Sequence, residues 1–179
     1  MNDWNEISLI LSECVKDNIS EKAFENNLTR VLNLLGWKQT SGNIEIKPSI
    51  RIGSVNKIEP DFVIKTDDGK KVFVIEIKQP NLPLKPNFQQ QLFSYMRQLK
   101  LEFGILIGER IQIFYDGDVQ DAENPILLEN ITYEKDNLKG LKFFDNFKKS
   151  DSIFDRLTEF RKESIENMNI ETETKNLIM

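Results

Sequence analysis

Two acidic side chains and a lysine lie at the edges of two apolar segments on either side of a turn signal. Asp61 precedes the first segment, and Glu76 and Lys78 close the second. The Asp-Asp-Gly sequence at 67–69 predicts that the two segments are β-strands joined as a hairpin or a close pair. Since side chains alternate along a strand, Glu76 and Lys78 project to the same side.

The second segment is apolar on both faces until Glu76, so we expect a central strand that is covered on both sides. A carboxylate and an ammonium group at the end of such a strand are costly to desolvate unless they are paired or bound to a metal. Asp61 lies early on the neighbouring strand and is predicted to reach the same place. The alternative is a surface Glu/Lys pair on an edge strand, with Pro60-Asp61 as an ordinary turn dipeptide.

The Pro-Asp pair at 60–61, followed by Glu-Ile-Lys at 76–78, resembles the PD-(D/E)xK nuclease signature. The resemblance implies that Asp61, Glu76 and the main-chain carbonyl of Ile77 supply oxygen ligands to Mg²⁺, for which Mn²⁺ can substitute. Such a metal polarises a phosphodiester and lowers the pKa of a bound water. The resemblance also implies that Lys78 orients the attacking water or offsets developing charge.

A glutamate on an earlier helix extends this resemblance. Ser20 is predicted to cap a helix that ends at Gly36-Trp37, and Glu25 lies near the start of that helix. PD-(D/E)xK nucleases commonly carry a glutamate at such a place. Glu25 is therefore a candidate catalytic residue that holds a metal-bound water or helps to position a second ion. Glu21, one turn earlier, is the competing assignment, and a solvent-exposed Glu25 is the alternative.

Gln91 and Tyr95 are one turn apart on a helix predicted over about 87–100. They resemble the Q-x-x-x-Y element of one nuclease branch, which includes the N-terminal nuclease domain of type I restriction-enzyme R subunits and the RecB-like nucleases. The resemblance implies that Gln91 hydrogen-bonds a metal-site carboxylate or a DNA phosphate, and that Tyr95 binds phosphate or stacks. The alternatives are a solvent-exposed Gln91 and a core Tyr95.

The order of elements predicts an α/β fold. A helix over 20–35, the two strands around the turn, a helix over 87–100 and apolar strands at 103–108 and 111–115 follow one another. The resemblance implies a restriction-endonuclease-like core, with a central mixed β-sheet flanked by helices.

The remaining segments predict supporting elements. Apolar periodicity indicates a helix over 4–17, and alternating isoleucines over 44–52 indicate a first strand or a bent pair around Pro48. Residues 116–125 are expected to form a solvated acidic loop, because their carboxylates lack the spacing of an EF-hand.

We expect three parts in the chain. Residues 1–135 form the nuclease-like core, and residues 136–168 form a helical extension packed on it, with helices at about 137–149 and 151–167. Residues 169–179 are polar and are expected to be a frayed tail.

The amino-acid composition limits the classes of protein to which the chain can belong. The 179 residues, with 39% hydrophobic and 30% charged side chains, are typical of one soluble globular domain. The chain has no long apolar run, so we expect no membrane span, and its single Cys14 permits no internal disulfide, which fits a cytoplasmic location. The absence of histidine excludes His-based nucleases and Ser-His triads, and the absence of a P-loop sequence excludes a P-loop motor.

Charge is unevenly distributed along a chain whose net charge is −5. Residues 38–100, which contain the nuclease-like motif, carry 11 basic and 6 acidic side chains, whereas the segments on either side are acidic. A local basic surface is what phosphate binding requires. The alternative is a solvated lysine-rich surface.

The resemblance therefore implies a metal-dependent DNA endonuclease domain of a restriction system. Its expected partners are DNA and the motor, specificity and modification subunits of a restriction complex. An R subunit continues into a helicase motor, which is absent from this sequence, so we expect either an excised domain or a free-standing nuclease-like protein. The alternative is a nuclease-fold module that binds nucleic acid or a subunit without cleaving.

Overall fold

The computed structural model describes residues 2–117 and 124–178. The strands are β1 (Ile44–Ile46), β2 (Ile50–Ile52), β3 (Asn56–Ile58), β4 (Phe62–Lys65), β5 (Lys71–Ile77), β6 (Phe103–Ile107), β7 (Ile111–Tyr115) and β8 (Ile126–Ile131). The helices are α1 (Asp3–Lys16), α2 (Glu21–Leu34), α3 (Pro86–Leu99), α4 (Leu138–Phe147) and α5 (Ile153–Ile178), with a 3₁₀ turn at Gln39–Ser41.

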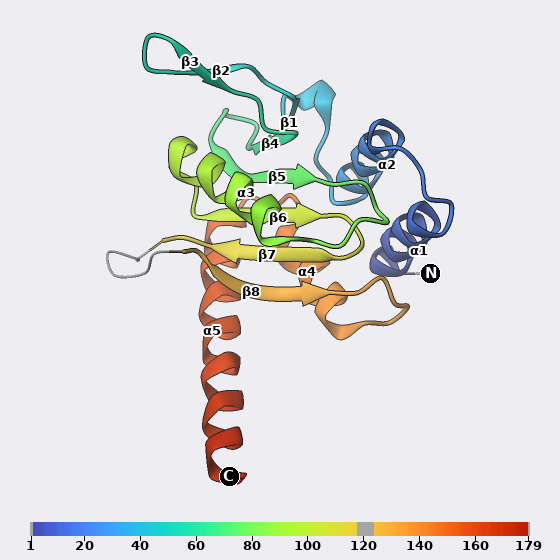
Figure 1. The fold of residues 1–179 in the computed structure, drawn as a ribbon, viewed down its shortest axis with the longest axis vertical. Helices are drawn as coiled ribbons and strands as arrows, with labels where there is room; N and C mark the ends of the chain where they lie inside the picture. The colour runs from blue at the N-terminus through green and yellow to red at the C-terminus, as the bar shows by residue number, and fades with distance from the viewer. Residues whose placement is uncertain (1, 118–123, 179) are drawn as a thin grey trace.

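A six-stranded sheet in the order β1-β4-β5-β6-β7-β8 forms the centre of the molecule (Figure 1). β5 and β6 are parallel, with α3 as the crossover between them, and the other neighbours are antiparallel. The predicted α/β class with a mixed sheet between helices is therefore confirmed.

Each face of the sheet is covered by its own hydrophobic cluster. On one face, Phe62 and Ile75 pack in a cluster with the apolar residues of α1, α2, α4 and α5. On the other face, Val63 and Val74 pack with Leu92 of α3. α3 lies in front of the sheet in Figure 1, and α4 and α5 lie behind it.

Local chemistry explains where the helices begin and end. The Ser20 side chain accepts a hydrogen bond from the Ala23 amide, so it caps α2 as predicted, and Gly36 follows with φ of 91°. α3 begins at Pro86, which the sequence had placed in the preceding loop. Proline is compatible with the first helical turn, because an amide hydrogen is not needed there.

Close packing brings α3 against the sheet at Gly104. A Cβ atom at this position of β6 would lie 2.4 Å from the Met96 sulfur and 3.1 Å from a Leu92 methyl. Since a real Cβ atom cannot approach so closely, the glycine lets α3 lie flat over the strands that carry the candidate site.

Two strand predictions need correction. β1 pairs with β4 in the large sheet, but β2 leaves it after Lys47 and pairs only with β3, so the two segments around Pro48 belong to different sheets. Lys47 has φ of 47°, which turns the chain away. β8 had no predicted counterpart, because its residues are only partly buried and its apolar alternation is weak. Of the expected acidic loop, residues 118–123 lie outside the described residues.

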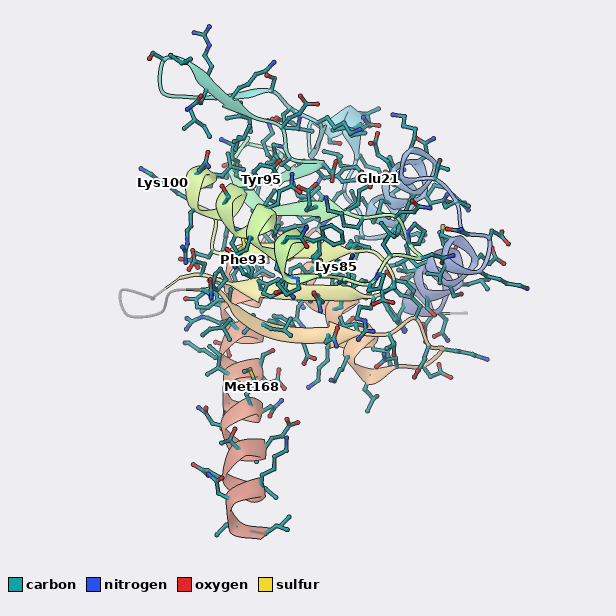
Figure 2. All side chains as sticks on the ribbon, viewed as in Figure 1. Glu21, Lys85, Phe93, Tyr95, Lys100 and Met168 are labelled. Atoms are coloured by element: carbon teal, nitrogen blue, oxygen red, sulfur yellow. The ribbon has the colours of Figure 1, made fainter. Side chains whose placement is uncertain are left out.

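The C-terminal tail is helical rather than frayed. α5 continues to Ile178, and the side chains from Glu166 onward are exposed, Met168 among them (Figure 2). The Glu171/Lys175 spacing of four residues favours the helix without tertiary contacts. The earlier part of α5 and α4 pack on the sheet, since Phe147 and Leu157 belong to the same cluster as β5.

Within residues 2–117 and 124–178, no helix combines the length and the apolar character that a membrane crossing requires.

Candidate functional site

The strand register places Asp61 directly across from Glu76. Phe62 pairs with Ile75 in the antiparallel β4–β5 ladder, so one step further along, Asp61 lies opposite Glu76. This step coincides with the end of β5, where the chain leaves the sheet. The hairpin predicted around residues 67–69 is therefore the element that brings the two acids together.

The two carboxyl groups also face the same side of the sheet. Val63 and Val74 both belong to the cluster beneath α3, and alternate residues of a strand share a face. Asp61, two residues before Val63, and Glu76, two residues after Val74, therefore point toward the α3 side. The edge-strand alternative is wrong, because β5 is an interior strand and Glu76 is only 3% exposed.

Burial keeps Glu76 protonated over a wide pH range. Desolvation, followed by a hydrogen bond to Asp61 and the Asp61 charge, raises the pKa of Glu76 to about 10, although the Lys78 charge opposes the shift. Its Oε2 atom is buried without a hydrogen-bond partner. Asp61 is better satisfied, since its Oδ2 accepts a hydrogen bond of 2.9 Å from the Ile77 amide.

Lys78, Gln91 and Tyr95 form one hydrogen-bonded chain beside the acids. The Lys78 ammonium donates to Gln91 Oε1 at 3.0 Å, and Gln91 Nε2 donates to the Tyr95 hydroxyl at 3.1 Å. Lys78 Nζ also lies 5.0 Å from the centre of the Phe88 ring. The one-turn spacing predicted for Gln91 and Tyr95 thus aligns them toward Lys78.

The pKa of Tyr95 is affected by the buried acids of the neighbouring strands. Burial raises its pKa, and the charge of Glu76 raises it further, while the Gln91 hydrogen bond opposes the shift. Figure 2 shows Tyr95 on the stretch of α3 that lies over the strands. The sequence alternative of a purely core tyrosine does not fit, because its hydroxyl takes part in this polar chain.

Glu25 is buried, and both of its carboxylate oxygens are paired with lysines. Its side chain is 4% exposed, and its two oxygens contact Lys22 at 2.9 Å and Lys47 at 3.1 Å. Burial by itself would raise the pKa of Glu25, but the hydrogen bonds from the two lysines outweigh it and hold the pKa below its usual value. The exposed Glu21 remains electrostatically linked to the site, since its charge contributes to raising the pKa of Glu76.

Lys47 is the site residue that sequence reasoning missed. Its amide donates to the Asp61 carbonyl at 2.9 Å and its ammonium pairs with Glu25, so it joins α2 to the strand that carries Asp61. The hydrogen bond to Glu25 raises the pKa of Lys47, burial opposes the shift, and the charges of Glu25 and Asp61 add to it. A lysine before a proline between two short strands is an ordinary sequence, and nothing in its type indicated this position.

The donor set fits a magnesium ion better than a metal held entirely by side chains. Among residues 2–117 and 124–178 there is no group of three or more His, Cys, Asp or Glu side chains arranged to hold a metal. Mg²⁺ needs only one or two carboxylates, because it keeps several waters. The buried and unpartnered Oε2 of Glu76 is an oxygen that such a cation would satisfy.

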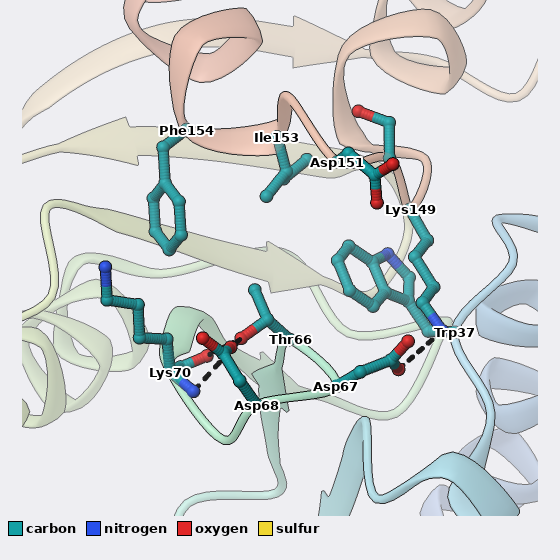
Figure 3. A pocket seen from close by; sticks show the side chains of 10 residues that line it. Trp37, Thr66, Asp67, Asp68, Lys70, Lys149, Asp151, Ile153 and Phe154 are labelled. Carbon is teal, nitrogen blue, oxygen red and sulfur yellow. Dashed lines mark hydrogen bonds and ion pairs between the residues drawn. The ribbon is translucent and has the colours of Figure 1, made fainter.

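A separate cavity of about 800 Å³ lies at the other end of the β4–β5 pair. Figure 3 shows Asp67 beside Lys149, and Lys70 near Phe154, on its wall. Asp67 accepts hydrogen bonds from Lys149 at 2.7 Å and from Asn43 at 2.9 Å. Asp67 and Lys149, which line this cavity, therefore have partners within the protein.

Comparison with known proteins gives a family and a fold. The family described as Type I restriction enzyme R protein N terminus (HSDR_N) matches residues 28–131. No curated protein sequence matches the chain. Among solved structures, a chain of the structure titled "cryoEM structure DrdV-DNA complex" superposes with a TM-score of 0.54 and 14% identity, over 81% of this chain and 99% of that chain. At this identity the likeness shows a shared fold.

Proposed function

Since the chain belongs to the family of the type I restriction enzyme R protein N terminus, we propose that it is a metal-dependent DNA endonuclease domain of a restriction system. The proposal assigns the PD-(D/E)xK signature to Asp61, Glu76 and Lys78. The observation that carries it is the buried Asp61/Glu76 pair on one face of the sheet, with an unpartnered carboxylate oxygen. A buried acid with a strongly raised pKa beside a second acid is a common feature of functional sites.

Asp61 and Glu76 would hold Mg²⁺ or Mn²⁺, with the Ile77 carbonyl as a further oxygen ligand. The bound ion supplies the polarisation of the phosphodiester and the lowered pKa of the attacking water. For this, Glu76 must release the proton that burial stabilises, and a nearby divalent cation favours its charged form.

Lys78 would act on the reacting phosphate. The Lys78 ammonium donates a hydrogen bond of 3.0 Å to the amide oxygen of Gln91, and this bond limits the positions that the flexible lysine side chain can take. A fixed cation next to the acids can offset the negative charge that develops on the phosphate oxygens. Tyr95 completes the chain and presents a hydroxyl that can donate to a phosphate oxygen.

Glu25 would be a positioning residue. Both of its oxygens are engaged by lysines, and Lys47 connects it to the main chain of Asp61. Glu21 is exposed, and it is the acid on α2 that remains available for a metal-bound water.

The fold shared with a chain of a DrdV–DNA complex supports DNA as the substrate. The family supports the motor, specificity and modification subunits of a restriction complex as further partners. Such an assembly would act on DNA in the cytoplasm.

The experiment is nicking of supercoiled plasmid DNA with Mg²⁺ or Mn²⁺. Asp61→Ala and Lys78→Ala are expected to lower the rate by about 10²-fold or more, in the range for loss of one preorganised catalytic group. Asp67→Asn and Lys149→Ala are the matched controls, since they remove an acid and a lysine from the opposite end of the same strand pair. Cleavage that persists in Asp61→Ala would reject the assignment.

A binding module without cleavage is the second candidate. It is favoured by the two lysines that engage both oxygens of Glu25, the acid that the resemblance assigns to a metal-bound water. This candidate requires DNA or subunit binding with no metal-dependent nicking, and binding that Lys78→Ala leaves intact.

A further inference from the structure

The β2–β3 hairpin projects from the body of the molecule. It forms a two-stranded sheet of its own and stands away from β1 and β4 at the top of Figure 1. At its base, Ile50 packs against the cluster beneath α3, so the hairpin rises on the face of the large sheet that carries Asp61 and Glu76. Isolated two-stranded hairpins are marginally stable in water, so packing at the base or contact with a partner is needed to stabilise this one.

Two like charges face each other across this hairpin. Arg51 and Lys57 are paired residues in the β2–β3 ladder, and both are exposed. Like charges directly opposite each other destabilise a strand pair. Within the described parts of the chain, neither side chain has a hydrogen bond or an ion pair. An anion placed between them would relieve the repulsion.

The hairpin segment itself contains no acidic side chain, although Glu45 and Glu59 flank it. Residues 47–58 contain the basic Lys47, Arg51 and Lys57 and no Asp or Glu. Gly53 has φ of 67°, which allows the tight turn at the tip, and Val55 beside it is 89% exposed. A positive ribbon with an apolar tip is complementary to a nucleic-acid groove lined by phosphates.

We propose that the β2–β3 hairpin is an arm that holds duplex DNA by its phosphates beside the acid pair. The proposal rests on the proposed function, because the acid pair marks where the DNA strand would be cut. A two-stranded β-ribbon can enter the major groove, which is about 12 Å wide. Arg51 and Lys57 each neutralise one phosphate, while the chemistry stays with the residues at the end of β5.

The experiment measures how DNA affinity depends on salt. Binding of a fluorescent duplex by anisotropy, in EDTA so that no cleavage occurs, is followed over a salt series for the intact chain and for Arg51→Gln/Lys57→Gln. Each phosphate contact contributes about 0.9 to the slope of log affinity against log salt, so the double variant should lower the slope by about 1.8.

Matched controls separate a local contact from a change of net charge. Lys162→Gln/Lys175→Gln removes two exposed positive charges from α5 on the far side of the molecule and should leave the slope unchanged. Arg51→Lys/Lys57→Arg keeps both charges and should also keep the slope. If the double glutamine variant does not fold, each single variant should lower the slope by about 0.9.

The outcomes separate the arm from the proposed function. A slope that Arg51→Gln/Lys57→Gln leaves unchanged overturns the arm, even if the chain cleaves DNA. A lowered slope in a chain that never cleaves supports the arm and counts against the endonuclease. If Arg51→Gln/Lys57→Gln abolishes binding to a restriction subunit but leaves the salt slope of DNA binding unchanged, the hairpin is a protein-docking element and the proposal is overturned.

Discussion

The two ends of the β4–β5 pair carry similar side chains in different surroundings. At the turn end, Asp67 accepts hydrogen bonds from Lys149 and Asn43, and the first of these lowers the pKa of Asp67 most. At the opposite end, burial raises the pKa of Glu76, and one of its oxygens has no partner. The turn end is a satisfied structural cluster, whereas the acid end retains an uncompensated desolvation cost.

The difference between the two ends lies in whether their buried polar groups have partners, and this is the feature on which the proposed site rests. A cavity of about 800 Å³ lies at the turn end, whereas the proposed site lies at the acid end. Buried polar groups normally find partners, because an unsatisfied one costs free energy. A ligand that binds the unpartnered oxygen of Glu76 would remove this desolvation cost, which is the physical argument for a site at the acid end.

The largest expected contrast between the two ends is in metal affinity. Glu76→Gln removes a charged ligand, and we expect it to weaken Mn²⁺ binding by about 100-fold, at the upper end of the effect of altering a metal ligand's environment. Asp67→Asn should change the affinity less than about twofold, because its side chain lies at the other end of the strands. Isothermal titration calorimetry measures the Mn²⁺ affinity of each variant. Equal losses of affinity in Glu76→Gln and Asp67→Asn would contradict the view that the metal binds at the acid end.

A smaller contrast is expected in the pH dependence of stability without metal. The folded state keeps a proton on Glu76 up to a pKa of about 10, whereas the unfolded chain releases it near the ordinary value of 4.5. The free energy of unfolding should therefore fall as the pH rises between these values. Glu76→Gln removes this dependence and should raise stability at pH 8 by a few kcal/mol, because the unsubstituted chain must keep a proton in the folded state that its unfolded state has released.

Urea unfolding in EDTA at pH 5 and pH 8 measures this effect. The gain from Glu76→Gln should be larger at pH 8 than at pH 5, and saturating Mn²⁺ should stabilise the unsubstituted chain more than the variant. A gain that is equal at both pH values would mean that Glu76 is not the group that titrates.

The smallest effect is expected at the turn end, with the opposite sign. The Lys149 hydrogen bond lowers the pKa of Asp67 below 3.8, so its contribution to stability is present above that pH and is lost as the pH falls through the folded-state pKa. Asp67→Asn should lower the melting temperature slightly at pH 7, and this difference should shrink as the pH is lowered below 3.8. A variant that melts higher than the unsubstituted chain at pH 7 would contradict the view of this end as a stabilising cluster.

Local sequence signals identified most of the framework of the candidate site. The Asp-Asp-Gly turn predicted the antiparallel strands β4 and β5, and the cap at Ser20 located the start of α2. The one-turn spacing of Gln91 and Tyr95 placed both side chains in one polar chain. These predictions succeeded because turns, caps and helical spacing depend on residues close in sequence.

Other features depended on residues far apart in the chain. Glu25 fitted the sequence pattern, but only the folded structure shows that two lysines occupy its oxygens. Lys47 had no signal of its own, since its role comes from contacts with α2 and with Asp61. The departure of β2 from the large sheet likewise follows from the positive φ of Lys47, which residue type did not indicate.

The amino-acid order by itself indicated most of the elements, the turn and the candidate side chains for a metal and for phosphate. Only the tertiary structure decided that Asp61 lies opposite Glu76 on the α3 face and that one carboxylate oxygen there is buried without a partner. The physical reason is that strand register and desolvation are properties of segments brought together by folding, whereas turns and caps are properties of neighbours along the chain.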